Sequence, residues 1–125
     1  MKVRLEVSPE EGAEALWGVV LVNLQQLRKM EEAYGFYPSA LEGIRTGQLR
    51  YLRHDPLEHW KTYTQLMESG KGDCEDLTCA VVAELLHRNI EAAPFVRPPS
   101  FGRTYHVLVE LGTGEFYDPS KQAGM

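Results

Sequence analysis

Three residues in the second half of the chain, Cys74, His106 and Asp118, have the types and the order of a nucleophilic site. A thiol becomes a nucleophile when a neighbouring base takes its proton, and a third group usually fixes the tautomer of that base. Cys74 follows two glycines and Asp73, a good helix N-cap, so the thiol is expected in the first turn of a helix. The positive end of the helix dipole favours the thiolate there. The alternative is an unreactive buried cysteine, as most free cysteines are.

His106 is the best candidate for the base among the four histidines. It lies inside a predicted strand, and Asp118 ends the next one, so a tight hairpin would bring the two side chains together. His87 is more than three turns along the cysteine's own helix, and His54 and His59 fall in a region with mixed signals. Both members of the pair also have structural interpretations: His106 as a hydrogen-bonded ring, and Asp118 as a turn residue before a proline.

Helices are predicted in the first two thirds of the chain. A proline followed by two acids begins a long amphipathic helix over residues 9–34, and Gly35 stops it. The apolar stripe of this helix is predicted to lie in the core: Ala13, Leu16, Trp17, Val20, Leu21, Leu24 and Leu27. Further helices are predicted over residues 57–67 and 73–88, with a short one opening at Pro38-Ser39 that Gly43 and Gly47 interrupt.

The spacing of apolar residues changes to alternation after Asn89. Strands are predicted over residues 92–96, 104–111 and 115–118, and a further short strand over 3–7. In the strand over 104–111, alternation places Val107 and His106 on opposite faces. Helices followed by a meander of strands predict an α+β fold, in which N-terminal helices pack on a small antiparallel sheet.

The composition indicates a single soluble domain over residues 1–125. The formal net charge of -5 argues against sequence-independent binding to nucleic acid or to an anionic membrane, since both need a basic surface. The first residues lack the apolar run of a signal peptide, and no stretch reaches membrane-spanning length. Cys74 and Cys79 point in different directions on one predicted helix, so no disulfide is expected. These features predict a cytoplasmic, reducing compartment.

Three segments around the candidate residues resemble the transglutaminase-like superfamily, whose papain-like fold carries a Cys-His-Asp triad. They are Gly-Asp-Cys-Glu-Asp-Leu at 72–77, Tyr-His-Val-Leu-Val-Glu at 105–110, and Phe-Tyr-Asp-Pro-Ser at 116–120. The passage from helix to strand at 89–94 is also similar to that family, and the resemblance covers residues 57–120. Trp60-Lys61-Thr62 looks most like the bacterial transglutaminase-like cysteine proteinase branch. Leu108 stands where an aromatic residue is common in the family.

The resemblance implies a role for each matched residue. Cys74 would be the nucleophile, His106 the general acid and base, and Asp118 the group that orients the imidazole. The backbone N–H of Cys74 would be one oxyanion donor, and a side chain upstream would be the second. Trp60, with its indole N–H, is preferred for the second donor; the alternatives are Thr62 and Gln65.

The same resemblance suggests a calcium site. Acids beside the nucleophile can bind calcium in the proteinase branch, and Asp73, Glu75 and Asp76 match their positions. Carboxylate oxygens are ligands that this ion prefers. The alternative is that the three acids cap the helix and complement its dipole. Calcium is therefore an option for this site, and no cofactor is required.

The predicted function is thiol-dependent acyl transfer or hydrolysis on a peptide or amide substrate, through a thioester. Whether the acceptor is water, as in a cysteine peptidase or amidase, or an amine, as in a transglutaminase, is open. Arg97, Phe101 and Arg103 are expected to contact the peptide or protein substrate. The alternative is a non-catalytic binding or assembly module that keeps the fold, of a kind found in phage and mobile-element proteins.

Overall fold

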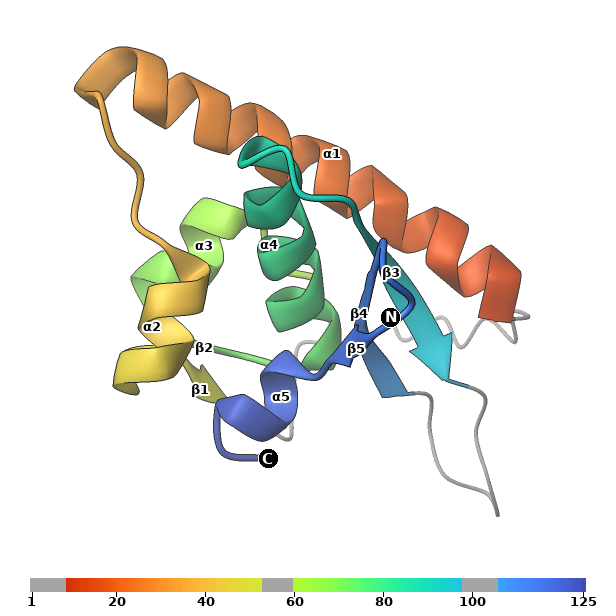
Figure 1. Cartoon of the computed structure of the whole chain (residues 1–125). Coiled ribbons are helices and arrows are strands. Elements are labelled where there is room, and N and C mark those ends of the chain that lie inside the picture. The colour runs from red at the N-terminus through yellow and green to blue at the C-terminus, as the bar shows by residue number, and fades with distance from the viewer. Residues whose placement is uncertain (1–8, 53–59, 98–105) are drawn as a thin grey trace, which may run out of the picture.

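The computed structural model describes residues 9–52, 60–97 and 106–125, with side chains from residue 14 onward. The remaining segments are not described, and several predictions fall on them: the strand over residues 3–7, His54, His59, Phe101 and Arg103. The described chain combines five helices with two small sheets (Figure 1). The predicted α+β class is therefore confirmed.

The first helix, α1 (Pro9–Tyr34), has the predicted length and ends at Gly35, whose φ of +76° is a left-handed conformation that glycine adopts without strain. Its inner face buries Leu16, Val20 and Leu27. The prediction that Leu21 belongs to this buried stripe is wrong, because its side chain is 61% exposed. Leu21 lies about 100° around the helix from Val20, and that rotation carries it away from the core.

Two short helices follow, α2 (Ala40–Thr46) and α3 (Tyr63–Ser69). Gly43 does not interrupt α2 as predicted but packs inside it, where an added Cβ would come within 2.9 Å of Leu49. The helix predicted over 57–67 corresponds to α3, which begins later. Its first N–H groups are held by side chains of α1: Asn23 Oδ1 accepts from Tyr63 N at 2.7 Å, and Gln26 Oε1 accepts from Thr64 N at 3.1 Å.

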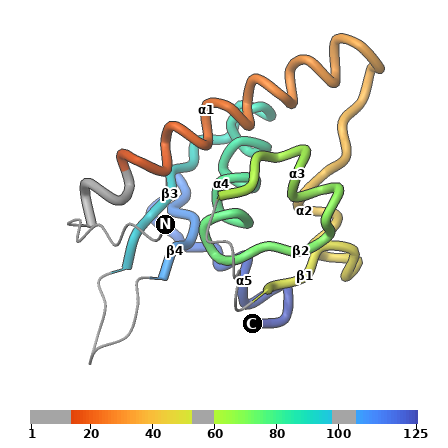
Figure 2. Tube along the Cα trace, turned by 180° about the vertical axis from the view of Figure 1, so that it is seen from behind, coloured from red at the N-terminus to blue at the C-terminus, as the bar shows by residue number. Residues whose placement is uncertain are grey.

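The fourth helix, α4 (Cys74–His87), is the centre of the molecule and contacts α1, α2, α3, the larger sheet and the last helix, α5 (Pro119–Gln122). It begins where the sequence predicts, since Asp73 is its N-cap and accepts from Asp76 N at 3.0 Å. Asp76 reaches back to Asp73 N, which completes a capping box. The other elements surround α4 (Figures 1 and 2), and every residue from Asp76 to Leu85 is buried.

The larger sheet has the predicted antiparallel meander, in the order β3 (Ala92–Arg97), β4 (His106–Leu111) and β5 (Phe116–Tyr117). The register pairs Val96 with Val107 and Arg97 with His106. Both α1 and α4 pack on this sheet, as predicted. The hydrophobic core lies between them and includes Val107 and Val109 of β4.

Three elements were not predicted. A parallel pair joins β1 (Arg50–Tyr51) to β2 (Lys71–Gly72), and a last short helix, α5 (Pro119–Gln122), follows β5. Two-residue strands have too few positions to show alternation. The start of α5 was visible as Asp118 before Pro119, a cap followed by a proline in the first helical position. Among the described helices, none has the length and apolar character to cross a membrane.

Candidate functional site

The first two turns of α4 lie against the backbone of Val107, the residue after His106. Thr78 Oγ1 donates to the Val107 carbonyl oxygen at 3.1 Å. One turn earlier, the Val107 backbone contacts the Cys74 thiol closely enough to oppose the rise in its pKa. The beginning of the cysteine helix and the beginning of β4 are therefore adjacent, as the candidate site requires.

His106 and Asp118 form the hydrogen bond that the hairpin predicted. The His106 Nε2 and Asp118 Oδ2 atoms are 2.8 Å apart, and both side chains are largely buried. The other oxygen, Oδ1, accepts from Ser120 N at 3.1 Å and from Lys121 N at 3.4 Å, so α5 fixes the carboxylate. An ionised carboxylate only accepts hydrogen bonds, hence Nε2 carries the proton and Nδ1 of the neutral ring is left as the basic nitrogen.

The third predicted contact is not formed. Among the hydrogen bonds between described residues, none joins Cys74 to His106; the thiol instead donates to Oε2 of Glu75 at 3.6 Å. Cys74 belongs to the core cluster with Val107, whereas strand alternation turns the His106 side chain to the other face of β4. His106 is the first residue of β4, so its ring lies at the end of the strand. The structure therefore brings together His106 and Asp118 and places Cys74 against the backbone of Val107, the residue after His106.

The structure contradicts the prediction that the Cys74 thiol has a lowered pKa. Burial raises the pKa of Cys74, and the charges of Glu75 and Asp73 raise it further. This direction is opposite to the one predicted from the helix dipole: burial is the largest cause, two carboxylates add to it, and the Val107 backbone opposes it only in part. At neutral pH the resting site holds a protonated thiol. Burial likewise raises the pKa of Cys79, and both cysteines are free, as predicted.

The three acids around Cys74 repel one another. Burial raises the pKa of Glu75 and of Asp76, and the neighbouring charge of Asp73 is the second cause for both. Asp76 is nonetheless well hydrogen-bonded, since Oδ1 accepts from Lys61 N at 2.8 Å and Oδ2 from Asp73 N at 3.2 Å. In the described ranges, no three His, Cys, Asp or Glu side chains are grouped to hold a metal ion. Asp73 and Asp76 have the capping role weighed as the alternative, and calcium binding stays a prediction.

The remaining predicted site residues are distributed differently. Trp60, the preferred second oxyanion donor, is 44% exposed, and no hydrogen bond between described residues joins it to Cys74. Arg97 is exposed at the end of β3 and is the cross-strand neighbour of His106. Phe101 and Arg103 lie outside the described ranges. Of the expected substrate contacts, Arg97 is thus the one that the register places beside the candidate base.

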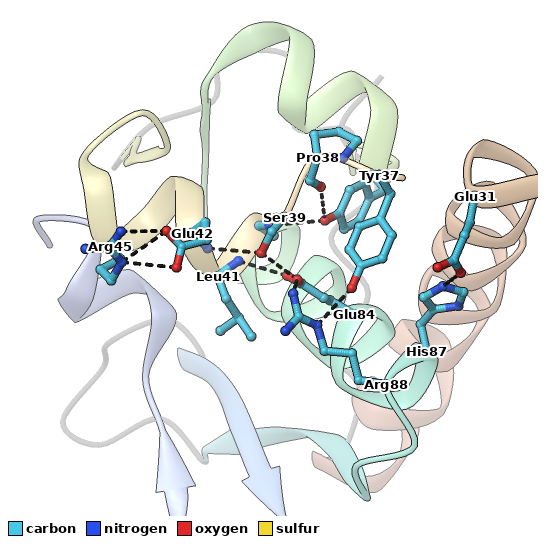
Figure 3. A network of polar contacts seen from close by, with 12 residues as sticks. Glu31, Tyr37, Pro38, Ser39, Leu41, Glu42, Arg45, Glu84, His87 and Arg88 are labelled. Atoms are coloured by element: carbon cyan, nitrogen blue, oxygen red, sulfur yellow. Dashed lines mark hydrogen bonds and ion pairs between the residues drawn. The ribbon is translucent and has the colours of Figure 1, made fainter. Parts of the chain in front are cut away.

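A second polar cluster, at the other end of α4, was missed (Figure 3). It is centred on Glu84, which is fully buried and accepts from Ser39 Oγ at 2.5 Å, from Leu41 N at 2.9 Å and from Arg88 Nη2 at 2.7 Å. Arg88 Nε also donates to the Tyr37 hydroxyl at 2.8 Å. The signal in the sequence was a single acid in the apolar run from Val81 to Leu85. This cluster attaches α2 to α4, and its charges are paired.

Comparison with known proteins adds no further constraint on this site. No protein-family model, curated protein or solved structure matches the chain. What the residues themselves define is a hydrogen-bonded His–Asp pair beside the first turn of a helix that begins with a buried cysteine.

Proposed function

We propose that the chain is a thiol-dependent enzyme of acyl transfer or hydrolysis, with Cys74 as nucleophile, His106 as general acid and base, and Asp118 as the group that orients it. The substrate would be a peptide or amide, and the core would be transglutaminase-like, with a papain-like arrangement of helix and antiparallel sheet. The observation that carries the proposal is the bond of 2.8 Å between His106 and Asp118, since it leaves Nδ1 as a base. Its position beside the Cys74 turn supports the assignment of the nucleophile.

The chemistry would begin from a neutral pair, because the pKa of the Cys74 thiol is raised. As substrate binds, the thiol proton moves to Nδ1 of His106 while sulfur attacks the carbonyl carbon. The resulting oxyanion would be held by the backbone N–H of Cys74 and by the proposed second donor, Trp60. The C–N bond of the substrate then breaks, and the amine leaves with the proton from His106. The acyl group stays on the Cys74 sulfur as a thioester. Water or a second amine then gives a proton to His106 and releases the acyl group.

One movement is required before this reaction. The Cys74 thiol must leave Glu75 and meet the His106 ring, which in the unliganded chain has no hydrogen bond to it. Catalytic hydrogen bonds are often formed only when substrate is present. Arg97 would contribute on the substrate side, since its guanidinium can bind a carboxylate or carbonyl group of a peptide next to the base.

The calcium site has no step in this mechanism. Both oxygens of Asp76 and one of Asp73 already accept backbone N–H groups, so the acids as arranged do not fit a cation. Calorimetric titration with calcium tests the prediction directly. Binding heat that disappears in Glu75→Gln would support a site that rearranges around the ion, whereas no heat and no change in melting temperature would reject it.

Alkylation of the two cysteines tests the proposed nucleophile, because Cys79 on the same helix is a matched control. Cys79 is also buried, and its thiol donates to the Leu16 carbonyl oxygen at 3.7 Å. The proposed mechanism assigns no histidine to Cys79. Iodoacetamide treatment with peptide mapping should label Cys74 first. His106→Ala should slow the labelling of Cys74 by about tenfold or more and leave Cys79 unchanged. Equal rates for Cys74 in the wild type and in His106→Ala would reject the triad.

A specific observation favours a second candidate function, the non-catalytic binding module. The thiol is buried, its pKa is raised, and it is hydrogen-bonded to Glu75 rather than to His106. In this case Cys74 is a core residue and both cysteines label slowly. Turnover distinguishes the two functions: release of amine from a panel of peptide amides, abolished in Cys74→Ala with the fold retained, would exclude the module.

A further inference from the structure

The outer face of α1 is apolar at its centre. Leu21 is 61% exposed and Val22 is 43% exposed, and the two adjacent side chains lie in the middle of the helix. Figures 1 and 2 show α1 along one side of the molecule, with the other described elements on its inner side. Scattered exposed side chains are normal, but two large neighbouring ones on an unpartnered helix face form a potential contact surface.

Gly18 makes the same face open to close approach. It lies one turn before Leu21 and Val22, and a Cβ built on it would meet nothing within 4 Å. Glycine inside a helix is about 1 kcal/mol less favourable than alanine. No contact within the described chain requires glycine there. Its lack of a side chain would instead let another helix come near the backbone of α1.

The charges that flank the apolar centre of this face are self-complementary. Glu14 lies before the apolar centre, and Arg28 and Lys29 lie after it; all three are exposed. No ion pair within the described ranges uses any of the three. The midpoint between Glu14 and Lys29 in the chain falls between Leu21 and Val22, so a second α1 running antiparallel through that midpoint would meet opposite charges at both ends.

We propose that this face binds a second copy of the chain, with the two α1 helices antiparallel about a two-fold axis at Leu21 and Val22. Leu21 would pack on Val22 of the partner subunit, and Glu14 would pair with Lys29 of the partner subunit. Because a two-fold interface is the same patch twice, each pair occurs twice. If the partner were a different protein, the opposite charges of α1 would not need to lie at equal distances from the midpoint between Leu21 and Val22. One helix from each copy is a small interface, so the association should be reversible and concentration-dependent.

Sedimentation equilibrium of the full chain over a concentration series tests this proposal. Leu21→Asp should abolish the dimer, whereas Ile90→Asp, at an exposed apolar residue after α4, should leave it intact. Glu14→Lys alone and Lys29→Glu alone should each weaken the dimer about fivefold or more, since each turns two attractive pairs into repulsive ones. The double reversal, Glu14→Lys with Lys29→Glu, should restore it.

Restored affinity in the double reversal is the decisive result. If each substitution weakened the dimer only by perturbing the structure, the two losses of affinity would add in the double variant and would not cancel. Circular dichroism of each variant checks that α1 remains folded. A wild-type chain that is monomeric throughout the series overturns the proposal, whether the face binds another protein or nothing. A dimer that persists in Leu21→Asp, or that the double reversal does not restore, overturns it as well.

Discussion

The two ends of α4 use charge in opposite ways. At the C-terminal end, the buried carboxylate of Glu84 accepts from Ser39, Leu41 and Arg88, so every charge there has a partner (Figure 3). Glu84 also lies at the beginning of α2, where a negative group is stabilised by the helix dipole. This end has the properties of a structural joint between α2 and α4.

At the N-terminal end, carboxylates crowd a thiol and none of their charges is opposed by a basic side chain in the described ion pairs. The pKa of Cys74, Glu75 and Asp76 is raised by burial, and the charge of Asp73 adds to each. Groups held away from their ordinary ionisation occur preferentially at functional sites. One helix therefore combines an end whose charges are paired, which holds the fold, with an end where burial and neighbouring carboxylates raise the pKa values of a thiol and two acids.

The comparison predicts its largest effect at Glu84. Glu84→Ala should lower the free energy of unfolding by about 3 to 5 kcal/mol, because it removes a buried partner from two neutral donors and one cation. Urea denaturation measures this. Glu42→Ala is the matched control, since Glu42 pairs with Arg45 on the surface and should change stability little. Similar losses in the two variants would show that the buried cluster is not a special joint.

A smaller effect is expected at Tyr63, which completes the same joint from α3. Its hydroxyl donates to the Pro38 carbonyl oxygen at 2.6 Å and accepts from Ala40 N at 2.8 Å. Tyr63→Phe keeps the ring and leaves a buried N–H unpaired, so stability should fall by about 1 to 3 kcal/mol. The loss should not depend on pH between about 5 and 8, because burial raises the pKa of Tyr63 far above this range. A pH-dependent loss would connect the joint to the titrating acids.

Periodicity predicted what depends on local sequence. The long apolar repeat before Gly35, the cap at Asp73 and the alternation after Asn89 gave α1, α4 and the antiparallel sheet. The hairpin also placed Asp118 near His106, because Asp118 directly follows β5 and lies diagonally across from His106 in the register that pairs Val109 with Tyr117.

Tertiary contacts decided the rest. Spacing alone does not fix where an apolar stripe ends, so the sequence places Leu21 in the core although its side chain is exposed. The contact of Gly43 with Leu49 is not visible in the sequence, so a glycine at that position predicts a helix break that does not occur. The direction of the Cys74 pKa depends on burial, which no local motif reports. The missing bond between Cys74 and His106 likewise depends on how α4 packs on β4.

The smallest predicted effect appears only at the higher pH and tests the N-terminal end of α4. A carboxyl whose pKa is higher in the folded protein than in the unfolded chain gives its full stabilisation below the unfolded value and loses it as pH rises through the folded one. Glu75 and Asp76 are such groups, so the wild type should lose stability from about pH 5 to about pH 8. Burial is the main cause of both raised pKa values, and the charge of Asp73 adds to it. Asp73→Asn keeps an N-cap of equal quality and removes that added contribution.

Asp73→Asn should therefore be more stable than the wild type by about 1 kcal/mol at about pH 8 and equal to it at about pH 5, as measured by thermal unfolding at both pH values. Asp73→Ala is the control, because it removes the same charge and also the cap, so it should be about 1 kcal/mol less stable than Asp73→Asn at either pH. Since the charge of Asp73 also raises the pKa of Cys74, alkylation of Cys74 in Asp73→Asn should begin at lower pH. Equal destabilisation of Asp73→Asn at both pH values would show that Asp73 acts only as a helix cap. The N-terminal end of α4 would then lack the electrostatic repulsion that distinguishes it from the end at Glu84.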